Sequence, residues 1–282
     1  MTQIPKITLR DGREVPVIKF GTVHIKGQVG KLAIMEAINN GYRSIDTSTN
    51  YHNEGIVGQA IRESGISRSE FVITSKLPGM FHQYDDALMS IQEQLARLGL
   101  TYLDEYIIHW PNPKDGLYVE AWQALVDAQK LGLVKTIGVS NFEKEHLDKI
   151  IEATGVVPAV NQIEMSPYFN NEDLHAYHQA LGIHSEAWSP TGRHISNVKE
   201  DGALETLAKK YGKSTTQVIL RWNYQRGVIN VVKASQSAHQ RENAAIFDFE
   251  LSDEDMAAIF ALDKGESGRV EGQNPHDYHE YD

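Results

Sequence analysis

The chain of 282 residues contains no cysteine. This absence excludes disulfides, thiolate nucleophiles and cysteine metal ligands. The sequence also lacks any run of about 18 apolar residues, so no membrane-spanning helix is expected. Its first residues, MTQIPKITLRDGREVP, lack the charged and then apolar leader of a secreted protein. We therefore expect a cytoplasmic protein.

Positive charge is scarce, with 27 Lys and Arg against 38 Asp and Glu and a net charge of −11. Such a balance argues against nucleic-acid binding as the main activity. The twelve histidines do not form the HExxH pattern of a zinc enzyme, so no metal is expected. No segment reads as an oligomer interface, and we expect a monomer.

Apolar segments rich in β-forming residues alternate with amphipathic segments of helical period, such as residues 86–100 and 118–133. Several helical segments end on glycine, a common helix stop. Strands that alternate with helices predict a parallel sheet, and eight such units in about 250 residues predict a (β/α)8 TIM barrel. A doubly wound sheet would need a GxGxxG turn, which is absent. The expected strands are residues 15–21, 43–46, 71–76, 103–110, 134–141, 159–164, 183–190 and 228–235.

Before the first strand, ITLRDGREVP contains an Asp-Gly turn between two short strand-like runs. This pattern predicts a small β-hairpin, which could close the N-terminal face of the barrel. No linker composition interrupts the chain. We therefore expect one domain over residues 1–282, with the C-terminal tail over the barrel mouth.

Polar residues stand where three successive strands end: Asp46, Lys76 and His109, with Tyr51 in the first of those loops. Barrel enzymes carry their chemistry at these strand ends. A tyrosine phenol has a pKa of about 10, which an adjacent ammonium lowers, and a carboxylate keeps that ammonium charged. A histidine then orients a substrate oxygen. Each residue alone has an ordinary structural explanation, but together they favour protonation of a carbonyl oxygen while a hydride reaches carbon.

The segments GYRSIDTSTNYHNEGIVGQAI, VITSKL, YIIHWP, IGVSNF and PAVNQIE resemble, in order and spacing, the motifs of the aldo-keto reductase superfamily. The resemblance extends from DGREVP to SGRV, and ATGVVPAVNQIE and SGRV favour its bacterial 2,5-diketo-D-gluconate reductase branch. It implies an NAD(P)H-dependent reductase of aldehydes, ketones or dicarbonyls, including diketo-gluconate or glyoxal types. Asp46, Tyr51, Lys76 and His109 would be its catalytic tetrad, with Tyr51 the general acid.

The same resemblance implies a set of cofactor contacts. Ser140, Asn141 and Gln162 would bind the nicotinamide carboxamide and Trp188 would stack on the ring. Lys233 and Ser235 would hold the adenosine 2′-phosphate. Further contacts are expected at Thr22, Val23, Asp46, Ser189, Arg193 with His194, Ala234, His239, Glu242 and Asn243.

Some positions depart from the family pattern. Gln236 and His239 stand where relatives that prefer NADPH often have arginines, so we expect NADPH use with weakened discrimination and some NADH activity. Lys19, in the turn PVIKFGT, replaces a usual glycine and suggests a local backbone adjustment. Pro78 and Val23 replace aromatic residues, which would widen the mouth. The substrate would contact Val23, Tyr51, His109 and Trp110.

Two other functions remain open at this point. A cofactor-binding redox sensor would keep the fold and show little turnover. A barrel hydrolase could use Glu164 and Glu186 as paired carboxylates, since both lie on expected strands. The hydrolase leaves Lys76 and Tyr51 without a role, and carbonyl reduction is the preferred interpretation.

Overall fold

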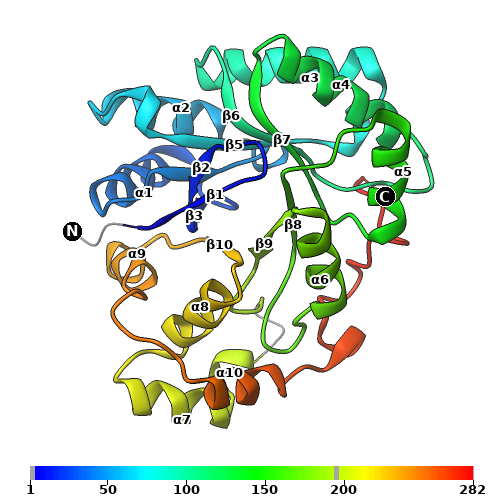
Figure 1. The fold of residues 1–282 in the computed structure, drawn as a ribbon. Helices are drawn as coiled ribbons and strands as arrows, with labels where there is room; N and C mark the ends of the chain where they lie inside the picture. Colours follow the sequence, from blue (N-terminus) through cyan, green and yellow to red (C-terminus); the bar gives the residue numbers. More distant parts are fainter. Residues whose placement is uncertain (1–3, 194–196, 282) are drawn as a thin grey trace.

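A computed structural model describes residues 4–193 and 197–281. Eight parallel strands form a closed barrel in the order β10-β3-β4-β5-β6-β7-β8-β9, with helices outside it (Figure 1). The predicted (β/α)8 fold is therefore confirmed. The strands are β3 Ile18–Gly21, β4 Ser44–Asp46, β5 Val72–Leu77, β6 Leu103–Ile108, β7 Val134–Ser140, β8 Val160–Glu164, β9 His184–Trp188 and β10 Ile229–Val232.

The helices pack around this barrel through apolar faces that meet buried strand residues. The long interval before β10 holds two helices, α7 and α8, as its length suggested. Gly99, Gly155 and Gly182 end α3, α5 and α6 in the left-handed conformation that glycine adopts without strain. The helices are α1 Gly27–Asn39, α2 Glu54–Glu63, α3 Tyr84–Leu98, α4 Tyr118–Lys130, α5 Lys144–Thr154, α6 Glu172–Leu181, α7 Gly202–Tyr211, α8 Thr215–Gln225, α9 Ser237–Ala244 and α10 Asp253–Phe260. Short 3-10 turns are η1 Thr49–Tyr51, η2 Arg68–Glu70, η3 Gly79–Phe81, η4 Asn197–Glu200 and η5 Gly265–Gly268.

The N-terminal hairpin consists of antiparallel strands β1 (Lys6–Thr8) and β2 (Glu14–Pro16). Leu9 and Val15 of the hairpin belong to one buried cluster with Val160 and Ile229, the first residues of β8 and β10. The Thr136 hydroxyl also donates to Asp11 Oδ2 at 2.6 Å. The hairpin thus covers the end of the barrel at which the strands begin, and the opposite end is left for a site.

Inside the barrel, Lys19 lies in β3 and is fully buried. It pairs with Val231 in a regular parallel register, so the expected backbone adjustment at a turn is wrong. Its ammonium contacts Glu105 of β6 and lies 2.5 Å from Glu186 Oε1 of β9. Two buried carboxylates accommodate the lysine, which explains why the strand needs no distortion.

The C-terminal segment leaves α10 and passes through η5 to end beside α5 (red in Figure 1). His276 Nδ1 in this segment lies 2.9 Å from Glu145 Oε1 of α5. Across the described parts of the chain, no helix combines the length and apolarity needed to cross a membrane.

Candidate active site

The barrel brings Asp46, Tyr51, Lys76 and His109 together at the ends of β4, β5 and β6. Lys76 Nζ lies 2.5 Å from Asp46 Oδ1 and 3.5 Å from the Tyr51 phenol oxygen, and it donates to the Thr47 carbonyl at 3.0 Å. The His109 ring stands edge-on to Tyr51, with ring centroids 6.3 Å apart. One ammonium therefore connects a carboxylate with a phenol, and an imidazole faces that phenol.

Burial and charge act in opposite directions on these groups. For Tyr51, burial outweighs the neighbouring ammonium and the pKa is raised, although Lys76 acts to lower it. For Lys76, burial alone would lower the pKa, but Asp46 and then Tyr51 raise it above the usual value. Lys76 therefore remains an ammonium. The expected influence of Lys76 on Tyr51 is present, but it offsets burial rather than producing a net decrease.

A chain of buried hydrogen bonds supports Asp46 from inside the barrel. Gln162 Nε2 donates to Asp46 Oδ2 at 2.8 Å and to Glu186 Oε2 at 2.9 Å. Glu186 in turn contacts the Lys19 ammonium. The amide nitrogen of Gln162 is therefore engaged by two carboxylates, and its amide oxygen is the atom left for a ligand.

At the ends of β7 and β9, the expected carboxamide and ring contacts gather in one place. Asn141 Nδ2 donates to the His109 carbonyl and to Ser140 Oγ, each at 3.0 Å. Asn141 Oδ1 accepts the indole N–H of Trp188 at 2.7 Å. The half-buried Trp188 ring is thus fixed in orientation, and the Arg193 guanidinium lies 5.1 Å from its centroid. Ser189 follows Trp188 with a positive φ of 50°, while His194 lies outside the described residues.

The loop after β3 lies directly against β4. Thr22 is buried, and its hydroxyl donates to the Asp46 carbonyl at 2.9 Å. Asn53 Nδ2 donates to the Thr22 carbonyl at 2.8 Å. These bonds place the half-buried Val23 next to the residues around Asp46.

The segment from β10 into α9 holds the residues expected at the adenosine end. Lys233, Ser235 and His239 are exposed, whereas Ala234 and Asn243 are buried and Glu242 is half-buried. Gln236 precedes α9 without a side-chain cap, so it leaves the first N–H groups of the helix available. Arg241 Nη1 donates to Ser237 Oγ at 2.8 Å, which places a cation at the first turn of α9. The sequence pattern had not indicated a role for this arginine.

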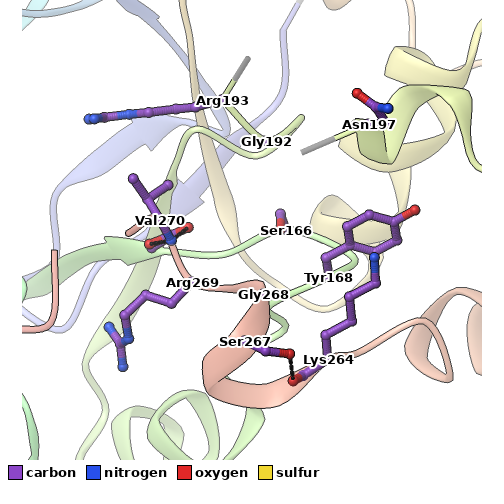
Figure 2. A pocket seen from close by; sticks show the side chains of 11 residues that line it. Ser166, Tyr168, Gly192, Arg193, Asn197, Lys264, Ser267, Gly268, Arg269 and Val270 are labelled. Carbon is purple, nitrogen blue, oxygen red and sulfur yellow. Dashed lines mark hydrogen bonds between the residues drawn. The ribbon is translucent and has the colours of Figure 1, made fainter. Parts of the chain in front are cut away.

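A cavity of about 320 Å³ lies beside the β9 loop and the C-terminal segment (Figure 2). Glu164 lines it and accepts the Val270 N–H at 3.0 Å, and burial raises the pKa of Glu164 to about 7. Glu186 instead lies in the barrel interior against Lys19 and Gln162. The two carboxylates have separate surroundings, so the paired-carboxylate hydrolase is wrong. The other lining residues are Ser166, Tyr168, Gly192, Arg193, Asn197, Lys264, Ser267, Gly268, Arg269 and Val270.

Glu145, His146 and His276 offer ligand atoms within 4.8 Å of one another, in the part of the chain that the structure describes. His146 Nδ1 accepts the Glu143 N–H at 3.1 Å, so the proton of the neutral ring is on Nε2. That nitrogen is then a donor rather than a metal ligand. The geometry of this group gives no support to a metal centre.

Sequence reasoning missed the C-terminal residues that reach the site. Glu280 Oε1 lies 2.5 Å from His109 Nδ1, and the Tyr278 ring packs against Trp110 with centroids 4.0 Å apart. The tail has no periodic pattern, and no motif in the sequence pairs it with His109. Only the fold reveals the contact.

Comparison with known proteins agrees with this geometry. The profile of the "Aldo/keto reductase family" matches residues 18–264. The chain is 43% identical to 2,5-diketo-D-gluconic acid reductase B of Corynebacterium sp., over 94% of this chain and 95% of that protein. It is 39% identical to methylglyoxal reductase DkgA of Yersinia pestis, over the same shares of the two chains. The structure of a Bombyx mori aldo-keto reductase in complex with NADP superposes with a TM-score of 0.90 at 35% identity, over 100% of this chain and 99% of that one. By sequence, by fold and by the groups at its strand ends, the chain belongs to the aldo/keto reductase family.

Proposed function

We propose that this protein reduces an aldehyde, ketone or dicarbonyl with NADPH, and that Tyr51 is the general acid. The observation that carries the proposal is the position of Lys76 Nζ, 2.5 Å from Asp46 Oδ1 and 3.5 Å from the Tyr51 phenol. An ammonium placed in this way stabilises the phenolate that remains after proton transfer.

The reduced nicotinamide, when bound, supplies the hydride to the carbonyl carbon. The side chains of the protein supply the proton and stabilise the group that loses it. Tyr51 donates its phenol proton to the carbonyl oxygen, and Lys76 stabilises the phenolate, with Asp46 and the Thr47 carbonyl holding the ammonium in place. His109, edge-on to Tyr51, orients the carbonyl oxygen toward the phenol. The buried position of the pair strengthens these interactions, because water does not screen them.

The residues present suit a phosphorylated dinucleotide. Trp188, held by its hydrogen bond to Asn141, offers a fixed ring face for the nicotinamide. Ser140 accepts a bond from the same Asn141 and donates to the Gln162 backbone carbonyl, so these polar residues lie together. At the other end, the uncapped start of α9 and the exposed Lys233 favour a phosphate group. The remaining proposed contacts are Thr22, Val23, Asp46, Ser189, Arg193, Ala234, Ser235, His239, Glu242 and Asn243.

Discrimination between NADPH and NADH depends on cations near the adenosine 2′-phosphate. Lys233 acts as a point charge, and Gln236 and His239 cannot grip a phosphate with two parallel bonds as arginine does. The Arg241 guanidinium bonds to Ser237, the first residue of α9, and so adds a cation near this end of the helix. We propose NADPH as the preferred cofactor, with measurable NADH activity.

The substrate is proposed to contact Val23, Tyr51, His109 and Trp110. The named relatives reduce 2,5-diketo-D-gluconic acid and methylglyoxal, which supports a small dicarbonyl as the substrate class. We further propose that the chain works in the cytoplasm as a monomer, and as one barrel domain whose tail lies over the mouth. The acidic net charge favours no nucleic-acid partner.

The test is the loss of reduced-nicotinamide absorbance with NADPH or NADH and a panel of aldehydes and dicarbonyls. Tyr51→Phe should lose activity by about 10²- to 10⁴-fold, the usual contribution of a general acid. Tyr84→Phe is the matched control, because it removes a phenol that donates to Asp127 on the barrel exterior. Activity that survives Tyr51→Phe would refute the assigned role. Cofactor binding without turnover in the parent protein would favour the redox sensor.

A further inference from the structure

A carboxylate from the end of the chain lies against the proposed catalytic histidine. Glu280 Oε1 is 2.5 Å from His109 Nδ1 and accepts a hydrogen bond from Asn50 Nδ2 at 2.6 Å. Glu280 Oε2 accepts the Gly79 N–H at 2.7 Å. The residue is 5% exposed although it stands near the C-terminus. Both oxygens therefore have fixed partners on the barrel.

The cradle around Glu280 is shaped for this side chain. The Glu280 N–H donates to Asn112 Oδ1 at 3.2 Å, and Asn112 itself has a positive φ of 43°. A Cβ on Gly79 would lie 2.2 Å from Asn112 Nδ2, so the glycine permits this close approach. The loops after β4, β5 and β6 thus present one N–H, two amides and an imidazole to the tail.

The neighbouring tail residues anchor the same segment. Tyr278 packs against Trp110 with ring centroids 4.0 Å apart and the planes tilted by 37°. His279 Nε2 lies 2.8 Å from Asp115 Oδ2, and the Tyr281 hydroxyl donates to Asn50 Oδ1 at 2.7 Å. Successive residues from 278 to 281 therefore each contact the barrel. Glu280 is held as part of the wall of the site.

Glu280 is ionised in this position. Burial alone would raise its pKa, but His109 and the Gly79 N–H lower the pKa below the usual value. His82, which is also buried nearby, is neutral, because burial lowers its pKa to about 4. The ammonium of Lys76 is engaged by Asp46. The Glu280 carboxylate therefore places a negative charge in the wall beside His109.

A carbonyl group that reacts must lie between the Tyr51 phenol and the His109 ring, whose centroids are 6.3 Å apart. The rest of the substrate then extends past His109 and Trp110, where Glu280 and Tyr278 form the wall. We propose that Glu280 is a specificity-determining residue: the site accepts neutral or cationic carbonyl compounds and disfavours those with a carboxylate near the reacting group. This inference rests on the proposed reductase function. A diketo-gluconic acid, for which one relative is named, carries such a carboxylate and should therefore be a poor substrate of this chain.

The test compares substrates of one shape and different charge: 4-carboxybenzaldehyde, its methyl ester and 4-(trimethylammonio)benzaldehyde. The parent protein should show a higher kcat/KM for the ester and the cation than for the acid, by about tenfold or more, because like charges several ångströms apart repel. Glu280→Gln keeps the shape of the side chain and removes its charge. It should reduce the preference for the ester over the acid, measured as the ratio of the two kcat/KM values in the variant, by about tenfold.

Two further variants make the result specific. Glu271→Gln changes an exposed glutamate of the same tail, so it alters the net charge equally and should leave the preference unchanged. Removal of residues 277–282 should relax the preference in the same way as Glu280→Gln.

An unchanged preference in both Glu280→Gln and the truncated chain would overturn the inference. An equal increase with all three substrates in Glu280→Gln would also overturn it, since the tail would then exclude substrates regardless of charge. Absence of turnover by the parent protein with every carbonyl compound and cofactor would refute the proposed function itself.

Discussion

Replacement of Lys19 by methionine should destabilise the barrel strongly. The Lys19, Glu105 and Glu186 side chains are each fully buried, and the ammonium contacts both carboxylates. Lys19→Met keeps most of the side-chain volume, so the main loss is electrostatic. Removal of one partner from a buried ion pair typically reduces stability by about 3–5 kcal/mol. Because Lys19→Met leaves two buried carboxylates without their cation, the loss of stability should lie toward the upper end of that range.

The assay is urea unfolding followed by circular dichroism, with the free energy of unfolding extrapolated to water. Lys130→Met is the matched control, because Lys130 is 68% exposed and its contact with Asp127 should contribute less than about 1 kcal/mol. The double variant Lys19→Met with Glu105→Leu should regain much of the lost stability, since apolar side chains of similar volume often replace a buried pair without loss. Glu186 keeps its bond from Gln162 in that variant. A decrease of less than about 1 kcal/mol for Lys19→Met would refute this reasoning.

Two further predictions concern stability. Burial raises the pKa of Glu105 and of Glu164 from 4.5 to about 7, so the folded protein binds more protons than the unfolded chain between these values. The free energy of unfolding should therefore fall as pH rises through this window, by up to about 3 kcal/mol per group, and equal stability by urea unfolding at about pH 5 and pH 8 would contradict this. In α2, Gly58→Ala should lower the melting temperature by several degrees, because its Cβ would lie 1.8 Å from the Leu98 carbonyl oxygen. Gly55→Ala, with nothing within 4 Å, should raise it slightly, and similar shifts for both variants would show that the close contact does not matter.

The barrel could be predicted because its signals are local. Each strand is a short apolar run, each helix has a period of its own, and glycines such as Gly155 and Gly182 end helices where a left-handed residue is needed. The gathering of Asp46, Lys76 and His109 followed from one topological rule, since parallel strands present their ends on the same face. Strand boundaries differed by a few residues, because strand ends such as His109 and Trp110 already belong to loops.

The partners of Lys19 could not be predicted in the same way. Glu105 lies on β6 and Glu186 on β9, and neither strand is hydrogen-bonded to the other or to β3, the strand of Lys19. Side chains meet across a barrel interior only when its tilt and register are fixed together. The sequence around a lysine in a strand does not indicate which carboxylates its ammonium will contact in the folded barrel. The sequence pattern therefore indicated an irregularity where the structure has an ion cluster.

The two features that escaped sequence reasoning act on opposite sides of the same site. From below, Lys19 holds Glu186, which binds Gln162, and Gln162 binds the carboxylate of Asp46 that engages Lys76. From above, Glu280 fixes the His109 ring against which a carbonyl group would lie. The contacts inside the barrel position the groups that support the proton donor Tyr51, whereas the tail contacts the region where the substrate would lie. Changes in the interior should therefore affect kcat for every substrate alike, whereas changes in the tail should alter the ratio between substrates of different charge.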